Sequence, residues 1–83
     1  MIKVSYSKQA IKALRRMPAN AAGLIRQKIV AYAEDPASQA TNVCKLRGRD
    51  GYRLRVGNWR VIFDRDGNVL EILEIGSRGG IYQ

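Results

Sequence analysis

The chain has 83 residues, which predicts one domain over residues 1–83 with room for a single modest core. Hydrophobic residues make up 46% of it and charged residues 27%, a balance that excludes a disordered chain. Fifteen Lys and Arg against seven Asp and Glu give a net charge of +8, which predicts a polyanionic partner: nucleic acid, an anionic membrane or an acidic protein.

Missing residue types and patterns exclude several kinds of site. No apolar run approaches the roughly 20 residues that a membrane-spanning helix needs, and the first ten residues lack the apolar segment of a secretory signal. There is no histidine and a single cysteine, Cys44, so we expect no metal site, no His-dependent catalytic triad and no internal disulfide. A lone thiol, which we expect to be a half-buried apolar residue, fits a cytoplasmic protein with no membrane partner.

In chain order, the first half of the sequence predicts a strand and two helices. Residues 2–6 alternate apolar with polar and predict a short strand. Ser7 stands where a helix N-cap belongs, and apolar residues then recur at helical spacing as far as Met17. Pro18 ends that helix and opens a second one, which stops at Asp35-Pro36. The basic side chains of the first helix are interpreted as a solvated face: Lys8, Lys12, Arg15 and Arg16.

The second half predicts an antiparallel meander of three strands. After a loop over residues 37–41 and a short basic segment at 45–48, residues 52–56 form the first of them. Gly57-Asn58 is a hairpin turn, residues 59–63 are apolar as a central strand requires, residues 64–68 are a second turn and residues 69–75 a third strand. The predicted fold class is therefore α+β: a short N-terminal strand, a two-helix hairpin and a three-stranded antiparallel meander, with the helices on one face of the sheet.

Basic residues concentrate just before and within this meander. Arg53 and Arg55 project from one face of their strand, about 7 Å apart, and Arg60 lies within their reach if the hairpin pairs across its turn. Arg78 closes the group if the third strand runs beside the second. Tyr82 and Tyr52 can stack on unpaired bases. The full set between residues 45 and 60 is Lys45, Arg47, Arg49, Arg53, Arg55 and Arg60.

Guanidinium groups give this cluster a specific chemistry. They pair with phosphate oxygens through two parallel hydrogen bonds, keep their charge near neutral pH and stabilise negative charge that develops in phosphoryl transfer. The alternative interpretation is a solvated strand face that discourages edge pairing. Trp59, in the expected central strand, is interpreted as a core residue.

The motifs KLRG, YRLRVGNWRVIF and EIGSRGGIY, behind a strand and two helices, resemble the RelE/ParE toxin superfamily, and in particular its RelE-type branch of bacterial type II toxin–antitoxin modules. The resemblance extends over residues 2–82. It implies an endoribonuclease that cuts messenger RNA in the ribosomal A site by attack of a ribose 2′-hydroxyl on the adjacent phosphate, without a metal or cofactor. By position, Arg60, Arg78 and Tyr82 match catalytic residues. Arg53 and Arg55 stand where the best-known RelE pattern has lysines.

That departure has a chemical consequence, because an arginine binds phosphate but does not act as a general base. Proton abstraction then falls to Tyr82, to a nearby carboxylate, or to the ribosome and substrate. Two alternatives to cleavage stay open: a ParE-type inhibitor of DNA gyrase, and an inactive remnant that binds only its antitoxin. The partners implied are a cognate antitoxin, messenger RNA on the ribosome with ribosomal RNA contacts, and DNA only through the antitoxin.

Overall fold

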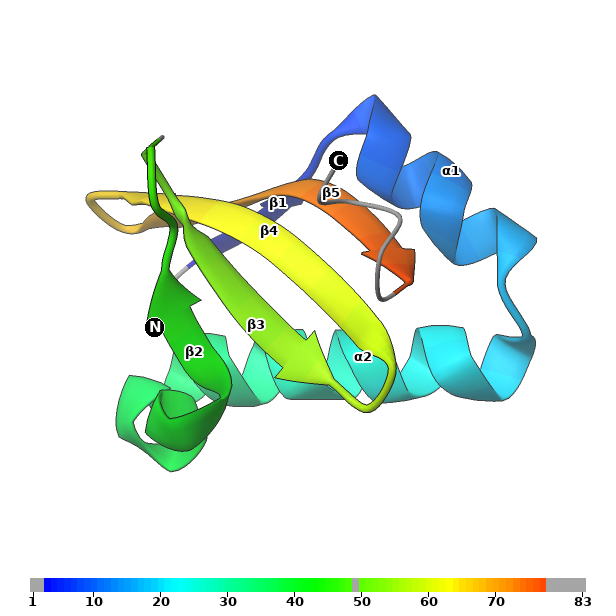
Figure 1. Ribbon diagram of the computed structural model, residues 1–83, viewed down its shortest axis with the longest axis horizontal. Coiled ribbons are helices and arrows are strands. Elements are labelled where there is room, and N and C mark those ends of the chain that lie inside the picture. The colour runs from blue at the N-terminus through cyan, green and yellow to red at the C-terminus, as the bar shows by residue number, and fades with distance from the viewer. Residues whose placement is uncertain (1–2, 49, 78–83) are drawn as a thin grey trace.

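The computed structural model describes residues 3–48 and 50–77, which form one curved sheet with helices packed against it (Figure 1). The first half of the chain is a strand and two helices, followed by a 3-10 helix, and the second half is strands. The elements are β1 (Lys3–Tyr6), α1 (Lys8–Arg16), α2 (Ala19–Glu34), η1 (Pro36–Asn42), β2 (Val43–Lys45), β3 (Tyr52–Val56), β4 (Trp59–Asp66) and β5 (Val69–Ser77). The α+β class and the element order expected from the sequence are confirmed.

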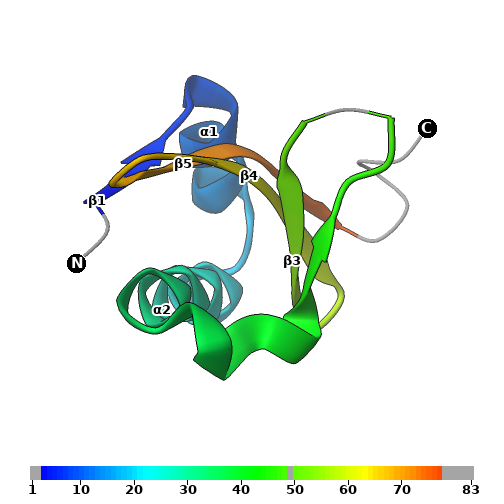
Figure 2. The same ribbon diagram turned by 90° about the vertical axis from the view of Figure 1, so that its left-hand side faces the viewer.

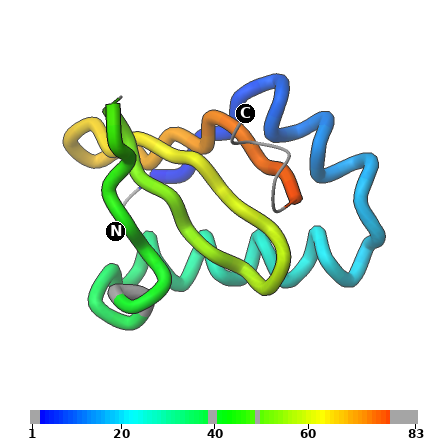
Figure 3. The backbone as a smooth tube through the Cα atoms, viewed as in Figure 1, coloured from blue at the N-terminus to red at the C-terminus, as the bar shows by residue number. Residues whose placement is uncertain are grey.

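The five strands form one sheet in the order β1-β5-β4-β3-β2. β3, β4 and β5 are the expected antiparallel meander, and its two turns lie at opposite ends of the sheet (Figure 3). β1 pairs parallel with β5, and β2 adds an antiparallel edge strand beside β3. η1 lies where the sequence predicted a loop over residues 37–41, and β2, which was not predicted, ends at Lys45, the first residue of the predicted basic segment.

Both hairpin turns of the meander are two residues long and begin with glycine. Gly57 and Gly67 each have a φ of +58°, and no other residue type among those described has a positive φ. A positive φ at the first central position only is the signature of a type II′ turn, which matches the right-handed twist of the flanking strands. Because Gly67-Asn68 suffices as a turn, β4 continues to Asp66, and the longer turn expected over residues 64–68 was wrong.

The hydrophobic core lies between the helices and one face of the sheet. Figure 2 shows the sheet curving over α2, which is seen end-on. Phe63, at the centre, is 1% exposed, and its ring lies 5.1 Å from that of Tyr32 on α2. Burying a side chain of this size stabilises the fold by roughly 1.5–3 kcal/mol. The helices contribute Ala10, Leu14, Met17, Ile25, Ile29, Tyr32 and Ala33, and the sheet contributes Leu54, Val56, Val61, Phe63, Leu70, Ile72 and Ile75.

Beyond the end of β1, the residues at the start of α1 make hydrogen bonds with the edge of β5. The Ser7 backbone amide donates to the Ile72 carbonyl at 2.8 Å, and its hydroxyl donates to the Leu73 carbonyl at 2.6 Å. The same hydroxyl accepts from the Ala10 amide at 3.1 Å, so the expected N-cap is confirmed. Farther along, the Ile75 amide donates to Gln9 Oε1 at 3.1 Å. Side chains thus satisfy strand groups that a neighbouring strand would otherwise pair.

A glycine contrast tests this description of the fold. Gly51 has a φ of +118°, and a Cβ there would lie 3.0 Å from the carbonyl oxygen of Phe63. We expect Gly51→Ala to lower the free energy of unfolding by roughly 1–3 kcal/mol in urea denaturation. Gly23 lies in α2, where a Cβ would meet nothing within 4 Å apart from its own helical backbone, so Gly23→Ala should raise the free energy of unfolding by about 0.5–1 kcal/mol. Effects of the same sign in the two variants would contradict the assigned backbone.

Candidate functional site

The register of the β3–β4 hairpin places two arginines directly opposite each other. Arg55 pairs with Arg60 across the strands, so their Cβ atoms lie about 5 Å apart on the same face. Arg60 pairs in turn with Gly76 on β5, so Arg55, Arg60 and Gly76 form one row of paired residues across the sheet. Gly76 adds no side chain to this row. Arg53 lies two residues from Arg55, on the same face. We call the surface formed by Arg53, Arg55 and Arg60 the arginine face. It is the side of the sheet away from the helices.

Facing guanidinium groups repel each other, and neither can relieve the repulsion by losing its proton. Arg55 is exposed and Arg60 is half-buried, so the pair is open to solvent on one side. Like charges directly opposite each other in a sheet destabilise it by roughly 0.2–1 kcal/mol. A bound anion removes that cost, and a phosphate can accept hydrogen bonds from both groups at once. The geometry therefore favours a phosphate between Arg55 and Arg60.

Charge on this face changes sign along the strands. The next row consists of Arg53, Ile62 and Glu74, and Ile62 is 1% exposed although it lies away from the helices. The row beyond it pairs Asp64 with Glu71. The face is thus basic near the Gly57-Asn58 turn and acidic toward the other end. This polarity directs an anion to the Arg55–Arg60 end.

The other basic residues predicted for the site lie elsewhere or outside the described residues. Lys45 pairs with Tyr52 in the register, so it is on the opposite face from Arg53. Arg47 is exposed in the segment between β2 and β3, at the far end of β3 from the Gly57-Asn58 turn (Figure 3). Arg49, Arg78 and Tyr82 fall outside the described residues. The structure thus brings together Arg53, Arg55 and Arg60 from the predicted set.

Two tyrosines are committed to packing rather than to the arginine face. The Tyr52 ring stacks on that of Phe63, with centroids 5.5 Å apart and an interplanar angle of 22°. Tyr52 is half-buried, so this contact uses part of the ring that was expected to stack on an unpaired base. Burial raises the pKa of the Tyr6 phenol above its ordinary value of 10.0, and the positive charge of Arg26 offsets part of this. Tyr6 is therefore protonated at neutral pH.

Cys44 is exposed, not half-buried as expected, and pairs with Arg53 across β2 and β3. Among residues 3–48 and 50–77, no group of three or more Cys, Asp or Glu side chains is placed to hold a metal ion. None of the helices in the described part of the chain is both long and apolar enough to cross a bilayer.

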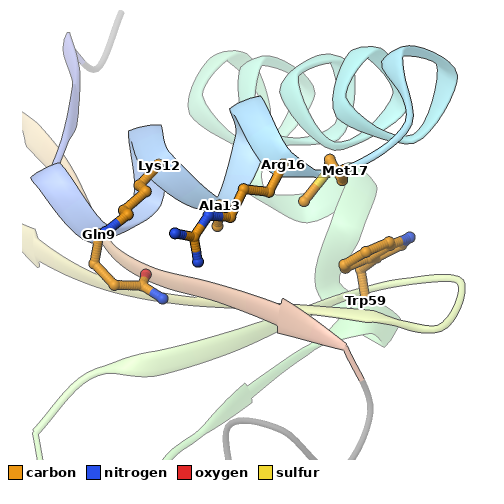
Figure 4. A pocket seen from close by; sticks show the side chains of 6 residues that line it. All are labelled: Gln9, Lys12, Ala13, Arg16, Met17 and Trp59. Carbon is orange, nitrogen blue, oxygen red and sulfur yellow. The ribbon is translucent and has the colours of Figure 1, made fainter.

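A cleft that the sequence did not predict opens between α1 and the start of β4 (Figure 4). Its volume is about 440 Å³, and α1 lies on one side of it with Trp59 on the other. Trp59, expected in the core, packs against the core with only part of its surface and is half-buried. The i, i+4 spacing of Lys12 and Arg16 was a signal that they share one side of a helix. The lining residues are Gln9, Lys12, Ala13, Arg16, Met17 and Trp59.

Comparison with known proteins gives a consistent family and fold. Residues 4–82 match the family described as the ParE toxin of the type II toxin–antitoxin system parDE. No curated protein sequence matches. A chain of the archaeal RelE–RelB complex from Pyrococcus horikoshii OT3 is similar, with 29% identity, a TM-score of 0.79 and coverage of 95% of this chain and 97% of that one.

Two further solved structures share the fold at lower identity. A chain of the intact E. coli RelBE toxin–antitoxin complex is 23% identical, with a TM-score of 0.74 and coverage of 93% of this chain and 96% of that one. The YoeB dimer from Staphylococcus aureus is 18% identical, with a TM-score of 0.71 and coverage of 88% and 92%. Both are evidence of the fold alone.

The opposed arginines generate a stability prediction. We expect Arg55→Gln to raise the free energy of unfolding by roughly 0.2–1 kcal/mol at low salt, because it removes one of two facing like charges. The gain should shrink in high salt, which screens the repulsion. Urea denaturation at two salt concentrations measures it. Arg15→Gln, on the exposed side of α1, makes the same charge change without an opposed cation and is the matched control. A loss of stability in Arg55→Gln, or an equal gain in both variants, would contradict the pairing.

Proposed function

The chain belongs to the ParE toxin family of type II toxin–antitoxin systems, within the RelE/ParE superfamily, and we propose that this toxin inhibits translation by cutting messenger RNA on the ribosome. The observation that carries the proposal is the pairing of Arg55 with Arg60 on an open sheet face, with Arg53 beside them. Three cations on one sheet face suit a bent phosphodiester, whose phosphorus carries four oxygens, better than a peptide carboxylate, which has two.

The proposed reaction uses the RNA's own hydroxyl as nucleophile. The ribose 2′-oxygen forms a bond to the adjacent phosphorus, and the bond from phosphorus to the 5′-oxygen of the next nucleotide breaks. The products are a 2′,3′-cyclic phosphate and a free 5′-hydroxyl, and the proton leaves the first oxygen and reaches the second. Negative charge grows on the non-bridging oxygens during this step, and Arg55 and Arg60 stabilise it there. Because arginine keeps its proton, neither residue accepts the one from the 2′-hydroxyl.

We infer that Glu74 accepts this proton. It lies on the arginine face, two residues along β5 from Gly76 and so about 7 Å from the Arg55–Arg60 row. Among the described residues that the register puts on this face, it is the carboxylate of the nearest row. A carboxylate oxygen can accept a proton from a hydroxyl, so Glu74 has the chemistry of a general base.

A cognate antitoxin is the protein partner of this toxin. Two of the similar structures are toxin–antitoxin complexes, and this chain carries a net charge of +8. An antitoxin segment with acidic residues on the arginine face would neutralise the facing cations and block the phosphate site. DNA contacts of the complex are then made by the antitoxin.

Loss of either opposed arginine should slow cleavage strongly. In a cell-free translation system with messenger RNA mapped by primer extension, Arg60→Ala and Arg55→Ala should each lower the cleavage rate by a factor on the order of 100–1000. Arg15→Ala, which removes the same charge from α1, should cut at the native rate. Uncut message at a full dose of the native protein, or native cleavage by both sheet variants, would overturn the proposal.

The assignment of Glu74 is tested separately from phosphate binding. Glu74→Gln should lower the cleavage rate by about 100-fold or more, because it removes the proton acceptor and keeps the side-chain shape. The Glu74→Gln variant should co-sediment with ribosomes as the native protein does. Arg55→Ala should reduce both the cleavage rate and the co-sedimentation. A Glu74→Gln variant that cuts normally would show that the proton goes to another group.

Gyrase inhibition is the second candidate, and the match to the ParE toxin family is the observation that favours it. A supercoiling assay with purified DNA gyrase separates the two functions. Inhibited supercoiling with intact messenger RNA would replace the nuclease by a gyrase inhibitor. Cut message with unaffected supercoiling would support the proposed nuclease. A chain inactive in both assays would be a remnant that serves only to bind its antitoxin.

A further inference from the structure

We propose that the cleft between α1 and Trp59 binds one unpaired nucleotide of RNA, with the base against the indole and the phosphate at Lys12 and Arg16. This goes beyond the proposed cleavage, because the cleft is a second RNA contact on another side of the sheet. Trp59 and Arg60 are consecutive residues of β4, so their side chains point to opposite faces. The two surfaces can therefore be tested independently.

The chemistry of the cleft is divided between two walls. Lys12 and Arg16 lie one helical turn apart on α1 and form the basic wall. Figure 4 shows Trp59, the first residue of β4, on the other side of the cleft. Cationic groups at one end of a cleft and an aromatic ring at the other are complementary to the phosphate and base of a single nucleotide. A volume of about 440 Å³ falls in the size range of small-molecule sites.

The rest of the lining is compatible with a base between the walls. Met17 and Ala13 supply apolar surface next to the indole. Gln9 Oε1 accepts from the Ile75 amide, which fixes the side-chain amide and leaves its NH₂ group as a donor. Among residues 3–48 and 50–77, no acidic side chain lines the cleft.

An acidic peptide is the competing occupant, and the aromatic wall argues against it. An Asp or Glu side chain would satisfy Lys12 and Arg16, but it brings no aromatic ring to stack on the exposed part of Trp59. A nucleotide satisfies both walls at once. The partly exposed indole is also held in place before binding, since Trp59 follows a two-residue turn and packs on the core.

Trp59 is the only tryptophan of the chain, so its fluorescence reports directly on the cleft. Titration of the full-length protein with AMP and with a short single-stranded oligoadenylate should quench this emission, because a stacked base contacts the indole. Ribose 5-phosphate, which lacks a base, should leave the emission nearly unchanged. The Arg55→Ala/Arg60→Ala double variant should retain the response to AMP, which separates this site from the arginine face.

The affinity of single variants for a fluorescein-labelled oligoadenylate shows which residues of the cleft contact RNA. Trp59→Leu should weaken binding by roughly 5- to 150-fold, the range that corresponds to loss of one base–aromatic stack. Lys12→Gln and Arg16→Gln should each weaken it and reduce its salt dependence. Lys8→Gln and Arg15→Gln remove the same charge from the same helix outside the cleft and should bind as the native protein does.

Three outcomes would overturn the proposal. They are no quenching by either AMP or the oligonucleotide, an equal loss of affinity in the cleft and control variants, and quenching by a glutamate-rich peptide but not by AMP. The last would assign the cleft to a protein partner. Nucleotide binding in the cleft with no messenger RNA cleavage would leave this inference intact while removing the proposed function, so the two failures are distinguishable.

Discussion

The register of the β3–β4 hairpin is the constraint on which the rest of this structure depends. It is set by a two-residue turn whose first residue, Gly57, has a φ of +58°. A slip of one residue would move Arg53 and Arg55 into the core and Leu54 to solvent, since strand side chains alternate between faces. The burial of Leu54 and Val61, which pair in the observed register, prevents that slip. The hydrophobic core thus maintains an electrostatically unfavourable pair of arginines on the outer face.

On β5, a β-bulge also decides which side chains face the core. Ile62 pairs with Glu74 and Phe63 with Ile72, so Leu73 is an extra residue on β5. Because of it, Ile72 and Ile75 both face the core although they are three residues apart, and Glu71 and Glu74 both face outward. Without the bulge, one member of each pair would be on the wrong side of the sheet.

Local signals in the sequence predicted most of this fold. The Ser7 cap, the Gly57-Asn58 turn and the alternation around Arg53 and Arg55 each depend on neighbouring residues, and each is present in the structure. The three-residue spacing of Ile72 and Ile75 was a readable sign of the bulge. β2 and the parallel pairing of β1 were missed because they depend on long-range pairing, and three residues carry no periodicity. The cleft was missed for a related reason, since α1 and Trp59 meet only in the folded chain.

Hydrogen bonds between β5 and the start of α1, donated by Ser7 and accepted by Gln9, position one side of the cleft. They tie α1 to β5, and the same strand pairs with β4 at Trp59 through Ser77. Both walls therefore contact β5, so a shift of one relative to the other would disturb hydrogen bonds to that strand. In the proposed nucleotide site, such a restraint would favour a flat ring over a bulky side chain on thickness alone, before any specific contact forms.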